Sequence, residues 1–198
     1  MSAVGALTTL TAQDIKHLHD NLSKFSTQEQ TQILSIIDEL ERRTHAKRCQ
    51  DDLIEFCKHI DPTYIVAAHH KRLAELLMQI AYGDKDRIAV SVPPRHGKSH
   101  LVSTLFPAWF LGKFPDKKVL MVSNTTDLAV DFGRKVRNII ADAKYQSVFP
   151  GINLASDSKS AGRWSTNRGG EYFATGVGSA LAGRGADLLL IEIGRAHV

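Results

Sequence analysis

Cysteine is scarce in this chain: among its 198 residues, Cys49 and Cys57 are the two thiols. They form no Cys-x-x-Cys pair, which argues against a disulfide-stapled secreted scaffold and against a cysteine-rich zinc site. Long apolar runs are also missing, and none approaches the roughly 20 residues of a membrane-spanning helix. The first basic residue is Lys16, so residues 1–12 lack the charged start of a signal peptide. We therefore expect a cytosolic protein with no membrane partner.

The composition is otherwise that of a folded protein. Apolar residues make up 43% and charged residues 23% of the chain, which is too apolar for a disordered segment. A length of 198 residues is enough for one or two domains with a buried core. The 25 basic and 21 acidic side chains give a net charge of +4, which permits a nucleic-acid partner without arguing for one.

Residues 1–60 carry helical patterns and are expected to form an N-terminal helical region. Apolar residues recur at steps of three and four between positions 15 and 25, which places them on one helical face. Ser26 and Glu29 form a capping-box pattern that opens a second helix. A third, short helix is predicted around residues 53–57 and ends before Pro62.

Between residues 61 and 191, short apolar runs alternate with helical stretches. Three runs, 88–92, 119–123 and 188–191, lack clean alternation and suit strands that are buried on both faces of a parallel sheet. This order predicts an α/β domain with a mainly parallel sheet, preceded by the N-terminal helices.

The connections between these runs have patterns of their own. Residues 98–110 are helical in pattern, and Pro107 is expected to kink or split that helix. Residues 124–127 can cap a helix that follows the second strand. Residues 163–177 contain two short β runs around an Asn/Gly turn, which predicts a hairpin.

The most informative stretch lies between the first predicted strand and the helix after it. It matches the phosphate-binding pattern GxxxxGK[ST], except that Val92 stands in place of the first glycine. In such a loop Gly97 lets the backbone approach the phosphates, Lys98 adds a positive charge, and the Ser99 hydroxyl can ligate Mg²⁺. A tight turn with a surface lysine is the alternative interpretation of the same residues.

Residues 93–99, Pro-Pro-Arg-His-Gly-Lys-Ser, closely resemble the deviant phosphate-binding loop of the large terminase subunit of tailed bacteriophages. That family typically has this loop instead of a full glycine pattern, so Val92 fits it. Further segments resemble the family's later motifs in the right order: 106–112, 149–151, 162–173 and 183–191. The resemblance covers residues 60–191, and Ala182, where the family more often has Thr, is a minor departure.

The resemblance implies a P-loop NTPase fold and an ATP hydrolase, a motor that uses ATP and Mg²⁺ to drive double-stranded DNA into an empty capsid. The full-length protein is expected to work as a homo-oligomeric ring on the portal vertex. Its expected partners are double-stranded DNA, the portal protein and the small terminase subunit. Its expected location is the host cytoplasm, docked on the procapsid during packaging.

The resemblance also assigns residues to the site. Arg95 is expected against the γ-phosphate within the same subunit, and Arg184 as a finger in the neighbouring subunit's site. Tyr64 and His69, next to His70, lie in the region that corresponds to the one holding the adenine base. Without the resemblance, Arg184 would be interpreted as a solvent-exposed residue in a glycine-rich turn, and Tyr64 and His69 as ordinary packing residues. The expected nucleotide-binding set is Tyr64, His69, Pro94, Arg95, His96, Gly97, Lys98, Ser99 and His100.

An ATPase of this class needs an acidic residue after the strand at 188–191 to hold Mg²⁺, and another to orient the attacking water. The family pattern predicts Asp-Asp-Pro there, whereas this chain continues with Glu192 and Ile193. Glu192 is therefore the candidate catalytic acid and, with Ser99, the candidate metal ligand.

Residues 192–198 are expected not to be native. Their sequence, Glu-Ile-Gly-Arg-Ala-His-Val, can be encoded as GAG ATC GGA AGA GCA CAC GTC, which contains a widely used sequencing-library adapter. The adapter would begin at the second base of the Glu192 codon and leave a native G, the first base of an Asp codon. A divergent native tail is the alternative.

The family's remaining ATPase strands and C-terminal nuclease domain have no counterpart in these residues. We therefore expect this chain to bind nucleotide weakly and not to hydrolyse it, and its last strand to lack the neighbours that would bury it. Two other functions stay open: a different P-loop nucleic-acid translocase such as a helicase, and a non-enzymatic helical adaptor with a vestigial nucleotide-binding fold.

Overall fold

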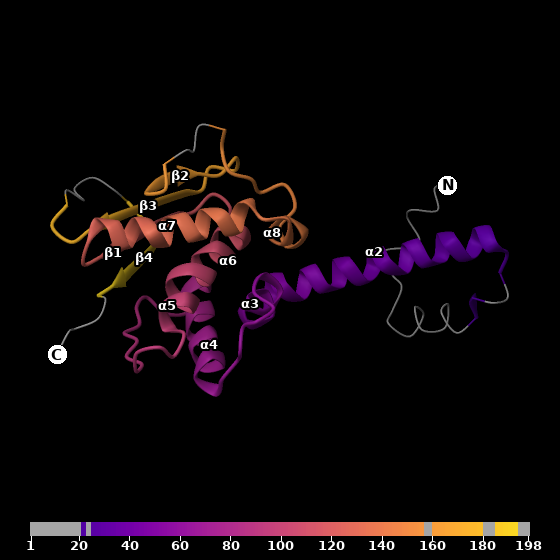
Figure 1. The fold of residues 1–198 in the computed structure, drawn as a ribbon, viewed down its shortest axis with the longest axis horizontal. Helices are drawn as coiled ribbons and strands as arrows, with labels where there is room; N and C mark the ends of the chain where they lie inside the picture. The colour runs from indigo at the N-terminus through magenta and orange to yellow at the C-terminus, as the bar shows by residue number, and fades with distance from the viewer. Residues whose placement is uncertain (1–20, 23–24, 157–159, 180–184, 194–198) are drawn as a thin grey trace. The chain divides into compact units, whose positions relative to one another are not determined.

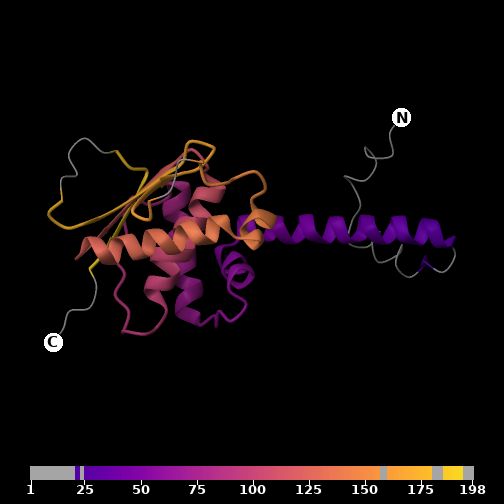
Figure 2. The same ribbon diagram turned by 45° about the horizontal axis from the view of Figure 1, so that its top comes forward.

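The computed structural model describes residues 21–22, 25–156, 160–179 and 185–193 (Figures 1 and 2). The chain divides into two compact units, residues 1–45 and 46–198. The helix predicted around positions 15 to 25 lies largely outside the described residues. The described residues form a mixed α/β structure in which helices precede a four-stranded, mostly parallel sheet, as the sequence predicts.

The two other predicted N-terminal helices are confirmed. Helix α2 (Thr27–Asp51) begins at the capping box, where the backbone N–H and the hydroxyl of Ser26 donate to the Glu29 carboxylate at 2.9 and 2.7 Å. Helix α3 (Leu53–Ile60) begins where the Asp52 carboxylate accepts two N–H groups of the first turn. None of the helices in the described part of the chain is long and apolar enough to cross a membrane.

The helix that follows residues 93–97 (the 93–97 loop) consists of three consecutive segments. They are α5 (Lys98–His100), the π-helical turn η4 (Leu101–Leu105) and α6 (Phe106–Lys113). Pro107 lies in the first turn of α6, and because it has no N–H it cannot continue the hydrogen bonding of the preceding turn. The chain stays helical through this proline, so the predicted split does not occur, and the hydrogen bonding changes to a π turn just before it.

Four strands form one sheet in the order β2-β3-β1-β4. Strand β1 is parallel to β3 and to β4, and β2 pairs with β3 as the predicted antiparallel hairpin. Because β1 and β4 run in the same direction, their carboxyl ends, Ser123 and Glu192, lie opposite each other. The strands span Lys118–Ser123 (β1), Arg163–Ser165 (β2), Glu171–Gly176 (β3) and Leu188–Glu192 (β4).

One face of this sheet is covered and the other is partly open. Helix α7 (Thr126–Ala141), capped at Thr125 as predicted, runs along the covered face (Figure 1), and α8 (Ala143–Val148) follows it. On the other face Leu189 and Ile191 are 53% and 63% exposed, so the expectation that the last strand is incompletely buried is confirmed. The side chains that point into the core from the strands include Val119, Met121, Tyr172, Ala174, Leu188 and Leu190.

The strand predicted at residues 88–92 does not form, and that prediction is wrong. Helix α4 (Ala68–Tyr82) is followed by an irregular segment that leads to the 93–97 loop (Figure 2). Ile88 and Val90 pack partly against the core, as their apolar character suggests. A strand also requires a neighbour for its backbone hydrogen bonds, and no segment among the described residues pairs with this one.

Gly133 of α7 lies so close to Ala161 and to Tyr172 of β3 that a methyl group does not fit. A Cβ atom at this position would lie 2.5 Å from the Ala161 carbonyl oxygen and 3.1 Å from the Tyr172 ring. We expect Gly133→Ala to lower the free energy of unfolding by about 1–3 kcal/mol, because overpacking outweighs the ~1 kcal/mol of helix propensity that alanine gains. Urea unfolding followed by tryptophan fluorescence measures this difference.

The matched control is Gly185→Ala, where a Cβ atom would meet nothing within 4 Å among the described residues. Its free energy of unfolding should stay within about 0.5 kcal/mol of the wild type. A Gly133→Ala protein more stable than the wild type would contradict the close packing of α7 on β3.

Candidate functional site

The 93–97 loop turns the chain sharply into α5. Arg95 and Gly97 have φ values of 64° and 76°, in the left-handed region. Glycine adopts this conformation readily, whereas a residue with a side chain pays roughly 1–2 kcal/mol for it. In the described part of the chain, Arg95 is the one non-glycine residue with a positive φ. Strain of this kind persists where the surrounding structure holds the backbone in place.

Two histidines from the first turn of α4 hold this loop. The Nε2 atoms of His69 and His70 lie 3.1 and 2.8 Å from the backbone carbonyl oxygen of His96. The Nδ1 atom of His96 lies 2.9 Å from the Pro94 carbonyl oxygen. His69 and His96 are exposed, whereas His70 is buried. The loop is therefore tied to α4 through a single carbonyl oxygen.

Tyr64 and His100 lie beside these histidines. The ring centroid of Tyr64 is 5.3 Å from that of His70 and 5.9 Å from that of His100. The Tyr64 hydroxyl is buried without a hydrogen-bond partner among the described residues, and burial raises the pKa of this side chain above its usual value. Two residues of the predicted set, Tyr64 and His69, thus lie beside His70, and a third, His100, lies beside Tyr64.

On its other side the loop leads to a buried ion pair. Lys98 Nζ donates to both carboxylate oxygens of Glu192, at 2.7 and 2.8 Å. Ser103 of η4 donates to Glu192 Oε2 at 3.2 Å, and the Ser123 hydroxyl donates to the Glu192 backbone oxygen at 2.9 Å. Glu192 is 7% exposed, while the Lys98 side chain keeps 27% of its surface exposed. The lysine is therefore accessible from solvent, and the carboxylate is anchored inside.

The electrostatic balance at Glu192 favours its charged form. Burial raises the pKa of this carboxyl group, but the hydrogen bonds and charge of Lys98 lower it, and hydrogen bonds from Ser99 and Ser103 add to that effect. The resulting pKa lies below the ordinary value, so Glu192 is ionised at neutral pH.

These contacts bring together groups that suit an anion and a divalent cation. The first turn of a helix favours anions, and parallel sheets bind ligands at the carboxyl ends of their strands. Lys98 offers a positive charge at this point. Ser99, Ser103 and Glu192 offer oxygen ligands of the kind that Mg²⁺ prefers.

The remaining predicted residues are distributed differently. Pro94, Arg95 and His96 are exposed on the loop, and Arg184 lies outside the described residues. Sequence reasoning did not single out Ser103, although it follows Ser99 at helical spacing, or Ser123, which ends an apolar run. Both features are visible in the sequence, but neither shows which group the serine hydroxyl binds.

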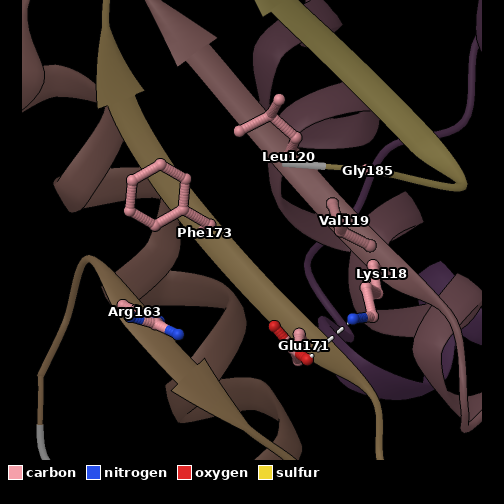
Figure 3. Close-up of a pocket in the computed structure, with 7 residues that line it drawn as sticks. All are labelled: Lys118, Val119, Leu120, Arg163, Glu171, Phe173 and Gly185. Carbon is pink, nitrogen blue, oxygen red and sulfur yellow. Dashed lines mark ion pairs between the residues drawn. The ribbon is translucent and has the colours of Figure 1, made fainter. Parts of the chain in front are cut away.

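A separate pocket of about 300 Å³ lies on the partly open face of the sheet (Figure 3). Two of its lining residues, Lys118 and Glu171, form an ion pair at 3.0 Å. None of the predicted site residues that the structure describes lines this pocket, so we place the candidate site at Lys98 and Glu192. The lining residues are Lys118, Val119, Leu120, Arg163, Glu171, Phe173 and Gly185.

Comparison with protein-family models, with curated proteins and with solved structures finds no match to this chain. The interpretation of the site therefore depends on its geometry and on the motifs in the sequence.

Removing the charge of Glu192 tests the buried ion pair. We expect Glu192→Gln to lower the free energy of unfolding at neutral pH by about 1–3 kcal/mol, because Lys98 loses a charged acceptor in a buried position. The matched control is Glu171→Gln, which breaks the exposed pair with Lys118 and should cost less than about 1 kcal/mol. Urea unfolding of the three proteins gives both values, and equal losses in the two variants would contradict the structural role of Glu192.

The same pair predicts a pH dependence. Because the pKa of Glu192 is lowered in the folded protein, its stabilising effect is complete above the ordinary value of 4.5 and is lost as the pH falls through the lower, folded value. Between roughly pH 5 and pH 3, the wild type should therefore lose more stability than Glu192→Gln. Unfolding curves across this range measure the difference, and parallel losses in both proteins would contradict it.

Proposed function

We propose that this chain is the ATP-binding region of a viral DNA-packaging motor, the large terminase subunit of a tailed bacteriophage, built on a P-loop NTPase fold. The observation that carries the proposal is the meeting of Lys98 and Glu192, at 2.7 Å, where the helix after the 93–97 loop begins and β4 ends. A lysine at this place matches the phosphate-binding lysine expected from the loop sequence. The order of the later motifs favours a terminase over another P-loop translocase.

In this proposal Lys98 exchanges partners when nucleotide binds. Its ammonium group, accessible from solvent, would leave the Glu192 carboxylate for the phosphates, and the backbone N–H groups around Gly97 would contact the same phosphates. Ser99 and the released carboxylate at position 192, Glu in this chain and Asp in the expected native frame, would then hold Mg²⁺, which supplies positive charge against the phosphate oxygens.

The other predicted residues keep the roles that the resemblance implies. Arg95, exposed on the loop, would reach the γ-phosphate within the subunit, and Arg184 would enter the neighbouring subunit's site. Tyr64 and His69 would border the adenine base. Double-stranded DNA, the portal protein and the small terminase subunit remain the proposed partners of the ring in the host cytoplasm.

Nucleotide binding tests the proposal directly. We expect weak, saturable binding of Mg·ATP to this chain without turnover, and an affinity at least about tenfold lower for Lys98→Ala, since the phosphates lose their main cationic partner. Isothermal titration calorimetry measures the dissociation constants, and phosphate release checks for turnover. Lys85→Ala, which removes the same charge from an exposed turn, is the control and should bind as the wild type does. Equal affinities of Lys98→Ala and the wild type would refute the proposal.

The source DNA tests both the tail and the family. We expect the native reading frame to depart from this sequence within the codon of Glu192 and to continue with an Asp codon. Sequencing across that junction from an independently prepared library measures this. Neighbouring portal and capsid genes would support a packaging motor, whereas native sequence running unchanged through Val198 would contradict the adapter interpretation.

A further inference from the structure

His70 stands out among the residues around the 93–97 loop because it is a buried imidazole with both ring nitrogens engaged. Its side chain is 7% exposed. Its ring neighbours those of Tyr64 and His69, at centroid distances of 5.3 and 4.0 Å. The expected nucleotide contacts include the neighbouring side chains but do not require His70 itself.

The hydrogen bonds of His70 define which nitrogen carries the proton. The Ala67 backbone N–H donates to Nδ1 at 3.2 Å, and because that group can only donate, Nδ1 must be the acceptor. In the neutral ring the proton therefore sits on Nε2, which donates to the His96 carbonyl oxygen at 2.8 Å. The ring thus links the start of α4 to the 93–97 loop.

The absence of a side chain at Gly97 leaves room for the His70 ring. A Cβ atom on Gly97 would lie 2.7 Å from His70 Nε2, closer than van der Waals contact allows. Glycine is therefore needed at position 97 for two reasons. Its backbone has a φ of 76°, which glycine adopts readily, and the His70 imidazole packs directly against its backbone. The His70 ring therefore contacts the loop twice at the peptide between His96 and Gly97: it bonds to the His96 carbonyl oxygen and packs against Gly97.

The direction of that peptide follows from the hydrogen bond. The peptide is trans and planar, so its C=O and N–H groups point in opposite directions. Drawing the His96 carbonyl towards α4 aims the Gly97 N–H away from α4. A reversed peptide would present a carbonyl oxygen in place of that N–H, and a carbonyl oxygen repels an anion.

We propose that His70 is a positioning residue that holds the peptide between His96 and Gly97 in the orientation that offers the Gly97 N–H to a nucleotide phosphate. This inference rests on the proposed nucleotide-binding function. His69, which is exposed and reaches the same carbonyl oxygen at 3.1 Å, supports the arrangement from its outer side.

Two conservative variants of His70 separate its two hydrogen bonds. A glutamine side chain places an N–H donor near the position of Nε2, so His70→Gln can still bind the His96 carbonyl. An asparagine side chain places an oxygen near the position of Nδ1, so His70→Asn can accept from Ala67 but cannot reach the loop. If His70 served only to stabilise α4, the asparagine variant would be the better replacement.

We expect the Mg·ATP dissociation constant of His70→Gln to stay within about threefold of the wild type, and that of His70→Asn to rise by about tenfold or more. Calorimetric titrations of the full chain measure these constants, and thermal unfolding reports the stability of each variant. An asparagine variant that binds as tightly as the glutamine variant would overturn the positioning role.

Failure of this inference can be told apart from failure of the proposed function. If Lys98→Ala binds Mg·ATP as the wild type does, the nucleotide site itself is refuted; if Lys98→Ala loses affinity and His70→Asn does not, only the role of His70 is refuted. Should neither His70 variant fold, nitrogen chemical shifts of the wild-type imidazole decide. A proton on Nε2 supports the inference, and a proton on Nδ1 overturns it.

Discussion

The ion pair between Lys98 and Glu192 is the contact on which the rest of the site depends. It joins residues 94 positions apart, one at the start of the helix after the 93–97 loop and the other at the end of β4. Removing one partner of a buried pair leaves an uncompensated charge, which is costly. The helix must therefore begin where the strand ends, and Ser103 and Ser123 hold the Glu192 carboxylate and backbone in that position.

The 93–97 loop is held between this pair and helix α4. On the α4 side, His70 binds the His96 carbonyl and packs on Gly97; on the other side, Lys98 is held by Glu192. These two anchors account for a backbone that takes positive φ values at Arg95 and Gly97. A loop held in this way is already shaped before a ligand arrives, which reduces the ordering that binding would require.

Local patterns predicted most of the secondary structure because the interactions behind them are local. The contacts of Ser26 with Glu29 start α2, and the hairpin around residues 166–170 forms between adjacent strands. The strand predicted at 88–92 does not form, which shows the limit of such patterns. An apolar run indicates a preference for burial but not whether a partner strand is present. At Pro107 the sequence predicted a kink or a split, whereas the structure has a π turn just before the proline within a continuous helical run.

By itself, the sequence determined which residues make up the candidate site: a Gly-Lys-Ser loop, an acidic residue after a buried strand, and histidines upstream. It also determined where α2 and α7 begin, because caps and apolar periodicity act over a few residues. Only the tertiary structure decided that Glu192 is the partner of Lys98 and that His70 faces the loop carbonyl. Both contacts join segments far apart in the chain, and packing of the whole domain, not local preference, sets such distances.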